Sequence, residues 1–105
     1  MNQMNFAFIS RHVPTQSKID LAAAQGITLV PVGYMNAFTV DPQTVHGLGI
    51  DNGTPFDGVV VVHPAAALRL CEDFLVGIFE NANRAEVGQP PKFEAVSFHL
   101  FDLRD

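Results

Sequence analysis

Phe6-Ala7-Phe8-Ile9-Ser10-Arg11-His12 is an apolar run that ends abruptly in a hydroxyl, a guanidinium and an imidazole. Apolar and aromatic residues bounded by polar ones predict a buried strand over residues 5–10. Pro14 and Thr15 then open an alanine-rich segment that is typical of a helix. The polar triplet is therefore expected in a strand-to-helix turn, and open α/β sheets bind ligands at such turns.

A helix and a second strand are expected directly downstream. Thr15 suits the N-cap of a helix over residues 16–25, and Gly26 suits the left-handed residue that ends it. Ile27-Thr28-Leu29-Val30 predicts the next strand, whose regular pairing Pro31 ends. This succession predicts a βαβ unit with a right-handed crossover.

Residues 34–57 are less regular. Phe38-Thr39-Val40 suits either a short strand or a packed loop. Asp41-Pro42 suits an N-cap and a first-turn proline, which predicts one or two helical turns around residues 43–46. The glycines at positions 47, 49, 53 and 58 predict a long loop, and loops of this length in a compact domain are often functional.

The clearest strand is Gly58-Val59-Val60-Val61-Val62, which ends at His63-Pro64. Its β-branched run lacks polar alternation and is expected to be covered on both faces. The spacing of apolar residues at 68, 71, 75, 78 and 82 predicts a long helix from Ala65 to about Ala82, with Cys71 inside it. Residues 83–91 are expected to form a surface connection, and residues 93–101 the last strand.

These elements predict a single α/β domain over residues 1–105. We expect a small Rossmann-like three-layer fold with a mainly parallel, four- or five-stranded sheet. The first strand and the Val59–Val62 strand are expected side by side and parallel at its centre, because both are apolar and each leads into a helix.

Composition and charge exclude several classes of protein. A net charge of −5 with six Lys and Arg argues against general nucleic-acid binding, which needs a basic face. A single cysteine excludes an intramolecular disulfide and fits a reducing cytoplasm. No apolar run approaches membrane-spanning length, so a cytoplasmic protein without a membrane partner is expected. Nine Phe residues with few charges predict an exposed apolar patch and a homodimer.

The residues with chemical content follow two strands. If these strands are parallel neighbours, His12 and His63 emerge at the same edge. Two imidazoles can serve as base and acid while an arginine holds an anionic oxygen, so we expect both histidines to be catalytic without a metal or other cofactor. Phosphate is expected to bind to Ser10, Arg11 and the backbone N–H groups around Ser17 and Ala66.

The same residues also have structural interpretations. Arg11 could pair with a carboxylate such as Asp41 or Asp57. His12 could cap a backbone carbonyl, and His63 could simply terminate its strand. These alternatives remain open at the level of the sequence.

A metal site is another use of the histidines. His12, His46 and His63 with a nearby aspartate could supply ligands. The sequence contains no short paired-ligand motif, however, so this alternative ranks below the others.

The quoted segments resemble the small CRISPR-associated ring nucleases over most of residues 6–70. In that family a Ser-Arg-His turn, here Ser10-Arg11-His12, follows the first strand of a short Rossmann-like domain. The resemblance implies metal-independent cleavage of cyclic oligoadenylate, a second messenger of type III CRISPR antiviral defence. His63-Pro64 and the long middle loop depart from the family pattern.

Two other functions are kept as alternatives. Arg11-His12 after one apolar strand and His63 after another resemble the histidine phosphatases, which implies similar phosphate chemistry, although Val13 replaces the glycine of that family. The alternative that ranks directly after the ring nuclease is a non-enzymatic interaction module, an accessory protein of a defence system or mobile element, whose Phe-rich surface would bind a partner.

Overall fold

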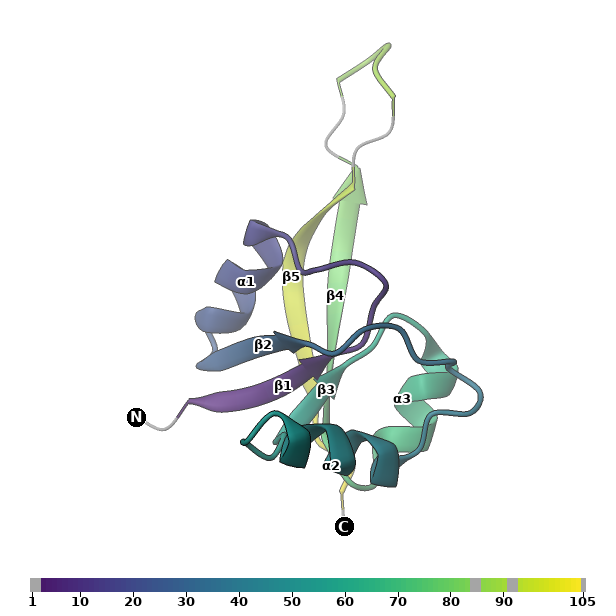
Figure 1. Ribbon diagram of the computed structural model, residues 1–105. Coiled ribbons are helices and arrows are strands. Elements are labelled where there is room, and N and C mark those ends of the chain that lie inside the picture. Colours follow the sequence, from purple (N-terminus) through teal and green to yellow (C-terminus); the bar gives the residue numbers. More distant parts are fainter. Residues whose placement is uncertain (1–2, 84–85, 91–92, 105) are drawn as a thin grey trace.

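The computed structural model describes residues 3–83, 86–90 and 93–104. In this part of the chain the elements form an α/β fold around a five-stranded sheet with the order β2-β1-β3-β4-β5 (Figure 1). β1 (Met4–Phe8), β2 (Ile27–Pro31), β3 (Gly58–Val60) and β4 (Leu75–Asn83) are parallel, whereas β5 (Phe93–Phe101) runs antiparallel to β4. The mainly parallel α/β class is confirmed.

β1 and β3 lie side by side in the sheet, as their sequences predict. Phe6 aligns with Gly58 and Phe8 with Val60 in parallel register, and the Ile9 N–H donates to the Val60 carbonyl at 3.0 Å. The pairing requires glycine at position 58, since a Cβ there would lie 2.5 Å from the Phe6 ring. This adjacency brings the residues that follow β1 and β3 to one edge of the sheet.

Helices cover both faces of the sheet (Figure 1). α1 (Gln16–Ala23) lies on one face, where Phe6, Phe8, Ala22, Ile27, Val60 and Phe98 form a core cluster. α2 (Pro42–Asp51) and α3 (Pro64–Leu70) lie on the other, over a cluster that includes Val59 and Val61. Because Val59 and Val60 belong to opposite clusters, β3 is covered on both faces. The strand ends at Val60, earlier than predicted, and Val62 is 70% exposed, so this cover does not reach the end of the valine run.

Local signals determine where the helices begin. The Thr15 side chain caps α1 by accepting a hydrogen bond from the Lys18 N–H at 3.4 Å, and Gly26 follows with a φ of +75°. Asp41 caps α2 in the same way, through a 2.8 Å bond from the Thr44 N–H. Both caps agree with the sequence, although α1 ends at Ala23, earlier than expected.

α2 is longer than the short helix expected around residues 43–46. It continues through Gly47 and Gly49 to Asp51, where a loop was expected. A Cβ at Gly49 would lie 3.2 Å from the backbone of Phe56, so this glycine allows α2 to pack closely on the segment that leads to β3. Residues 37–39 form a turn, which corresponds to the packed-loop alternative.

The prediction of a long helix from residue 65 to 82 is wrong. α3 ends at Leu70 with Cys71 as its C-cap, and the chain turns into β4 at Leu75. Cys71 is therefore not inside a helix. Its thiol donates to the Leu68 carbonyl at 3.5 Å.

The error has a physical reason in the composition of β4. Leu75 and Phe79 pack in the cluster under α1, whereas Val76 packs in the cluster under α2 and α3. Leu75 and Phe79 are four residues apart, so two side chains on one face of this strand also have the spacing of one helix face. Gly77 is unfavourable in a helix but suits this strand, because a Cβ there would lie 2.4 Å from the Phe98 ring. Long-range packing therefore decides the structure of this segment. Among the described residues, no helix is long and apolar enough to span a membrane.

Candidate functional site

A hollow of about 250 Å³ opens at the edge where β1, β2 and β3 end. Ile9 after β1, residues 34–38 after β2 and residues 61–63 after β3 line it, together with Ala66 of α3. We name it the edge hollow. Its walls come from the segments that follow three parallel strands, which is where open α/β sheets bind ligands.

Arg11 lies beside the edge hollow. Its guanidinium carbon is 4.8 Å from the centroid of the Tyr34 ring, which is a cation–π contact. Asp41 and Asp57 accept hydrogen bonds from backbone N–H groups instead of pairing with it. Within the described ranges Arg11 has no carboxylate partner, so its N–H groups can bind an anion.

His63 separates β3 from α3 and is fixed in position by two contacts. Its Nδ1 accepts a 3.0 Å hydrogen bond from the Ala65 N–H, which caps α3, and its ring meets the Phe38 ring edge-on at 5.3 Å between centroids. Since Nδ1 must be unprotonated to accept this bond, the neutral ring carries its proton on Nε2. Nε2 is therefore the atom that His63 can offer to a ligand.

Ser10 and His12 follow β1 at the same edge. The His12 N–H donates to the Ser10 hydroxyl oxygen at 3.2 Å, so the serine side chain holds the turn. The His12 side chain is exposed. The two histidines thus extend from the ends of neighbouring parallel strands, one oriented by a cap and the other open to solvent.

The backbone N–H groups near Ser17 and Ala66 do not form one cradle. The Ala66 N–H already donates to the His63 carbonyl at 3.1 Å. Ser17 lies in the first turn of α1, on the opposite face of the sheet from α3 (Figure 1). Arg11 is therefore the stronger candidate for holding a phosphate.

His46 is placed away from the edge hollow. It lies on α2 with its ring against Phe74, at 4.7 Å between centroids. In the described part of the chain, no three His, Cys, Asp or Glu side chains come together as a group that could hold a metal ion. The structure thus offers the metal alternative no ligand set there.

A second histidine cluster lies on the β4–β5 hairpin. His99 Nε2 is 3.1 Å from Ser97 Oγ and 3.0 Å from Glu80 Oε2, and Ser97 Oγ also donates to Glu80 at 3.0 Å. A proton relay needs one imidazole nitrogen for the nucleophile and the other for the carboxylate, whereas here Nε2 contacts both. The cluster therefore ties two strands together and does not form a catalytic triad.

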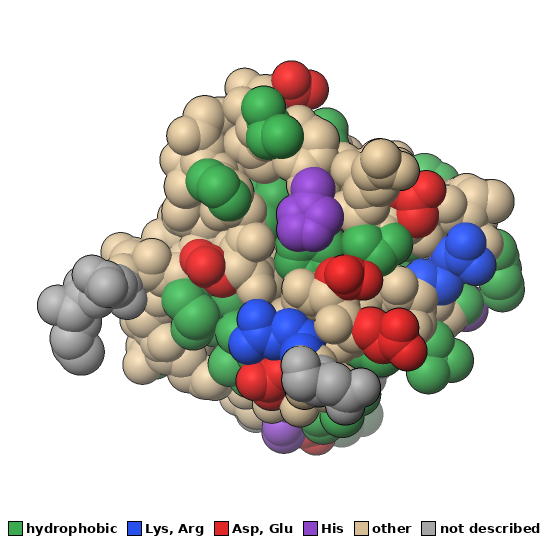
Figure 2. Space-filling view, turned by 90° about the horizontal axis from the view of Figure 1, so that it is seen from below, with side chains coloured by type: hydrophobic (Ala, Val, Ile, Leu, Met, Phe, Trp, Pro, Cys, Tyr) green, Lys and Arg blue, Asp and Glu red, His purple; other side chains and the backbone are tan. Residues whose placement is uncertain are grey.

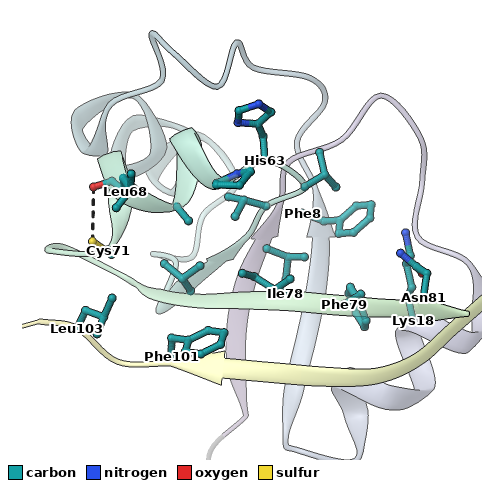
Figure 3. Close-up of a pocket in the computed structure, with 16 residues that line it drawn as sticks. Phe8, Lys18, His63, Leu68, Cys71, Ile78, Phe79, Asn81, Phe101 and Leu103 are labelled. Carbon is teal, nitrogen blue, oxygen red and sulfur yellow. Dashed lines mark hydrogen bonds between the residues drawn. The ribbon is translucent and has the colours of Figure 1, made fainter.

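A larger cavity of about 590 Å³ shares residues 61–63 with the edge hollow (Figure 3). We name it the apolar cavity. Its walls come from α3, β4 and the end of β5, and Lys18 of α1 closes one end. β3 pairs with β4 only as far as Gly77, so the cavity opens where β4 continues past its neighbour.

Sequence reasoning missed Tyr34, Phe38 and Lys18. Tyr34 could have been found, since it follows β2 at the same edge that drew attention to Arg11. Phe38 carries no comparable signal because it lies in a turn, where Asn36 Oδ1 accepts its N–H at 2.8 Å. Lys18 is an ordinary polar position of an amphipathic helix, and only the folded chain places it against Phe8.

Comparison with protein-family models found no match, and searches of curated proteins and of solved structures found no significant match. The function must therefore be argued from the site itself.

Proposed function

We propose that this chain is a nucleotide-binding domain whose site is the edge hollow. The observation that carries the proposal is the parallel pairing of β1 with β3, which sends Arg11 and His63 out of the same edge. A guanidinium without a carboxylate partner attracts phosphate oxygens, and the exposed rings of Tyr34 and Phe38 offer stacking surfaces to a base.

The surface charge favours a small ligand over a long nucleic acid. The net charge is −5, and acidic side chains are interspersed with basic ones on the face seen in Figure 2. The described part of this face therefore lacks the broad positive field that general nucleic-acid binding requires. Attraction to phosphate must therefore be local, at Arg11.

The reaction that suits these groups is metal-independent cleavage of a ribose-linked phosphodiester, with cyclic oligoadenylate as the substrate that the sequence resemblance implies. One histidine takes the proton of the ribose 2′-hydroxyl, whose oxygen bonds to the neighbouring phosphorus. The other histidine protonates the departing 5′-oxygen as its bond to phosphorus breaks. While Nδ1 caps α3, His63 Nε2–H can donate a hydrogen bond to a phosphate oxygen. To act as the acid, His63 would have to be the imidazolium, in which Nδ1 also carries a proton and no longer accepts from Ala65.

The test is incubation of the protein with cyclic tetra-adenylate in EDTA, followed by chromatography of the products. We expect linear products from the wild type, and turnover reduced by about 10²–10⁴ in His12→Ala. Arg11→Gln should weaken both binding and turnover. Arg104→Gln is the matched control, since Arg104 is exposed and its ion pair is with Asp102, two residues away. An inactive wild type, or variants that match it, would remove the enzymatic proposal.

An interaction module is the second candidate, and exposed apolar side chains at the same edge favour it. Phe38 is 66% exposed and Val62 70% exposed. Such side chains side by side are typical of a surface that a second copy or another protein covers. Sedimentation over a micromolar concentration range should then reveal a homodimer that Phe38→Ser weakens, whereas a concentration-independent monomer would count against self-association.

A further inference from the structure

We propose that the apolar cavity binds an amphipathic carboxylate, with the carboxylate at Lys18 and an apolar tail along β4. The proposal is independent of the nucleotide site, although residues 61–63 contribute to both hollows. At about 590 Å³ the cavity lies within the range of small-molecule sites, about 300–1,000 Å³.

The walls of the cavity are apolar and incompletely covered. Ile78 and Phe101 project from the β4–β5 pair, and Leu68 faces them from α3 (Figure 3). Leu68 is 75% exposed and Phe101 45% exposed, because α3 ends after two turns and leaves this part of the sheet open. Covering these side chains with an apolar tail would remove them from water, which favours binding.

One end of the cavity carries a positive charge. The Lys18 ammonium lies 5.4 Å from the centroid of the Phe8 ring and 5.7 Å from that of Phe79. No carboxylate of the described residues pairs with it. Asn81 also lines the cavity, toward the same end in Figure 3. An ammonium and an amide N–H at one end of a cavity can both donate to a carboxylate.

The opposite end of the cavity has no charged side chain among its described lining residues. Leu68, Cys71 and Leu103 lie there, away from Lys18 (Figure 3). The cavity is therefore polarised along its length, cationic at one end and apolar at the other. A neutral apolar molecule would leave the charge without a partner, whereas an amphipathic carboxylate satisfies both ends.

The test is calorimetric titration with decanoate below its micelle concentration, alongside the neutral decan-1-ol. We expect saturable binding of decanoate and about fivefold weaker binding of the alcohol. Shortening the acid from decanoate to octanoate should weaken binding about fourfold per methylene removed. Binding without preference for the carboxylate, or no binding at all, would overturn the proposal.

Two matched pairs of variants locate the ligand. Leu68→Glu should abolish binding, whereas Ile50→Glu, the same change at an equally exposed position of α2, should leave it intact. Lys18→Gln should reduce the preference for decanoate over the alcohol, and Lys18→Arg should restore it. If Leu68→Glu instead dissociates a dimer of a wild type that binds no decanoate, the cavity is an interface between copies and the proposal fails.

Discussion

The edge hollow and the apolar cavity lie on either side of the same three residues, 61–63, and differ in what surrounds their cation. Beside the edge hollow, the Arg11 guanidinium lies over the Tyr34 ring. In the apolar cavity the Lys18 ammonium lies over two phenylalanine rings. Both cations are held by aromatic faces and neither has a carboxylate partner among the described residues.

The difference lies in geometry and solvation. A planar guanidinium can hold two oxygens of a phosphate at once, whereas an ammonium acts as a point charge and suits a single carboxylate. Tyr34 and Phe38 give the edge hollow exposed aromatic rings, whereas Leu68, Ile78 and Leu103 give the apolar cavity aliphatic walls. One fold thus offers two anion-binding environments with different preferences for the rest of the ligand.

The largest effect is expected at His63, which belongs to both hollows. His63→Asn keeps an oxygen acceptor for the Ala65 N–H but removes the imidazole Nε2, so turnover of cyclic tetra-adenylate should fall by about 10²–10⁴ with the melting temperature nearly unchanged. His63→Ala should lose both turnover and the cap. Full turnover in His63→Asn would show that this residue is only a helix cap.

The next effect concerns Gly58, on the strand that supports both hollows. In Gly58→Ala the new methyl group would lie 2.5 Å from the Phe6 ring and 2.7 Å from the Leu75 carbonyl oxygen. Urea denaturation should reveal a loss of about 1–3 kcal/mol in the free energy of unfolding. Gly47→Ala is the control, since nothing lies within 4 Å of its new methyl group, and it should stabilise α2 slightly. Equal stability of the two variants would contradict the close approach of β1 and β3.

A smaller effect separates the two hollows from each other. Arg11→Gln should weaken cyclic tetra-adenylate binding about tenfold and leave decanoate binding unchanged. Lys18→Gln should do the reverse, weakening decanoate about fivefold. Titrating each variant with both ligands measures these changes in binding. If either variant weakens both ligands equally, the hollows are one site.

The sequence predicted the centre of the fold better than its periphery. β1 and β3 were predicted, with their adjacency, because two apolar runs that each lead into a helix are typical of the central strands of a buried parallel sheet. The segment after Leu70 was misjudged because Leu75, Ile78 and Ala82 have the spacing of one helix face. Only pairing with β3 and β5, which are distant or later in the sequence, makes a strand the more stable structure. The apolar cavity was missed for the same reason, since β4 forms one of its walls.

The smallest effect concerns Glu80, which lies on β4 between Phe79 and Asn81, two residues that line the apolar cavity. Hydrogen bonds from His99 and from Ser97 lower the pKa of the Glu80 carboxyl below its ordinary value of 4.5. A carboxyl whose pKa is lower in the folded state adds stability above about pH 4.5, and that stability is lost as the pH falls through the folded value. The wild type should therefore exceed Glu80→Gln in melting temperature by more at about pH 6 than at about pH 3, and only slightly because the cluster is exposed. Glu72→Gln is the matched control, since it removes an exposed carboxylate of the turn after α3, outside this cluster. If the difference in melting temperature between the wild type and Glu80→Gln is the same at both pH values, the charge of the Glu80 carboxylate does not help to hold β4 and β5 together.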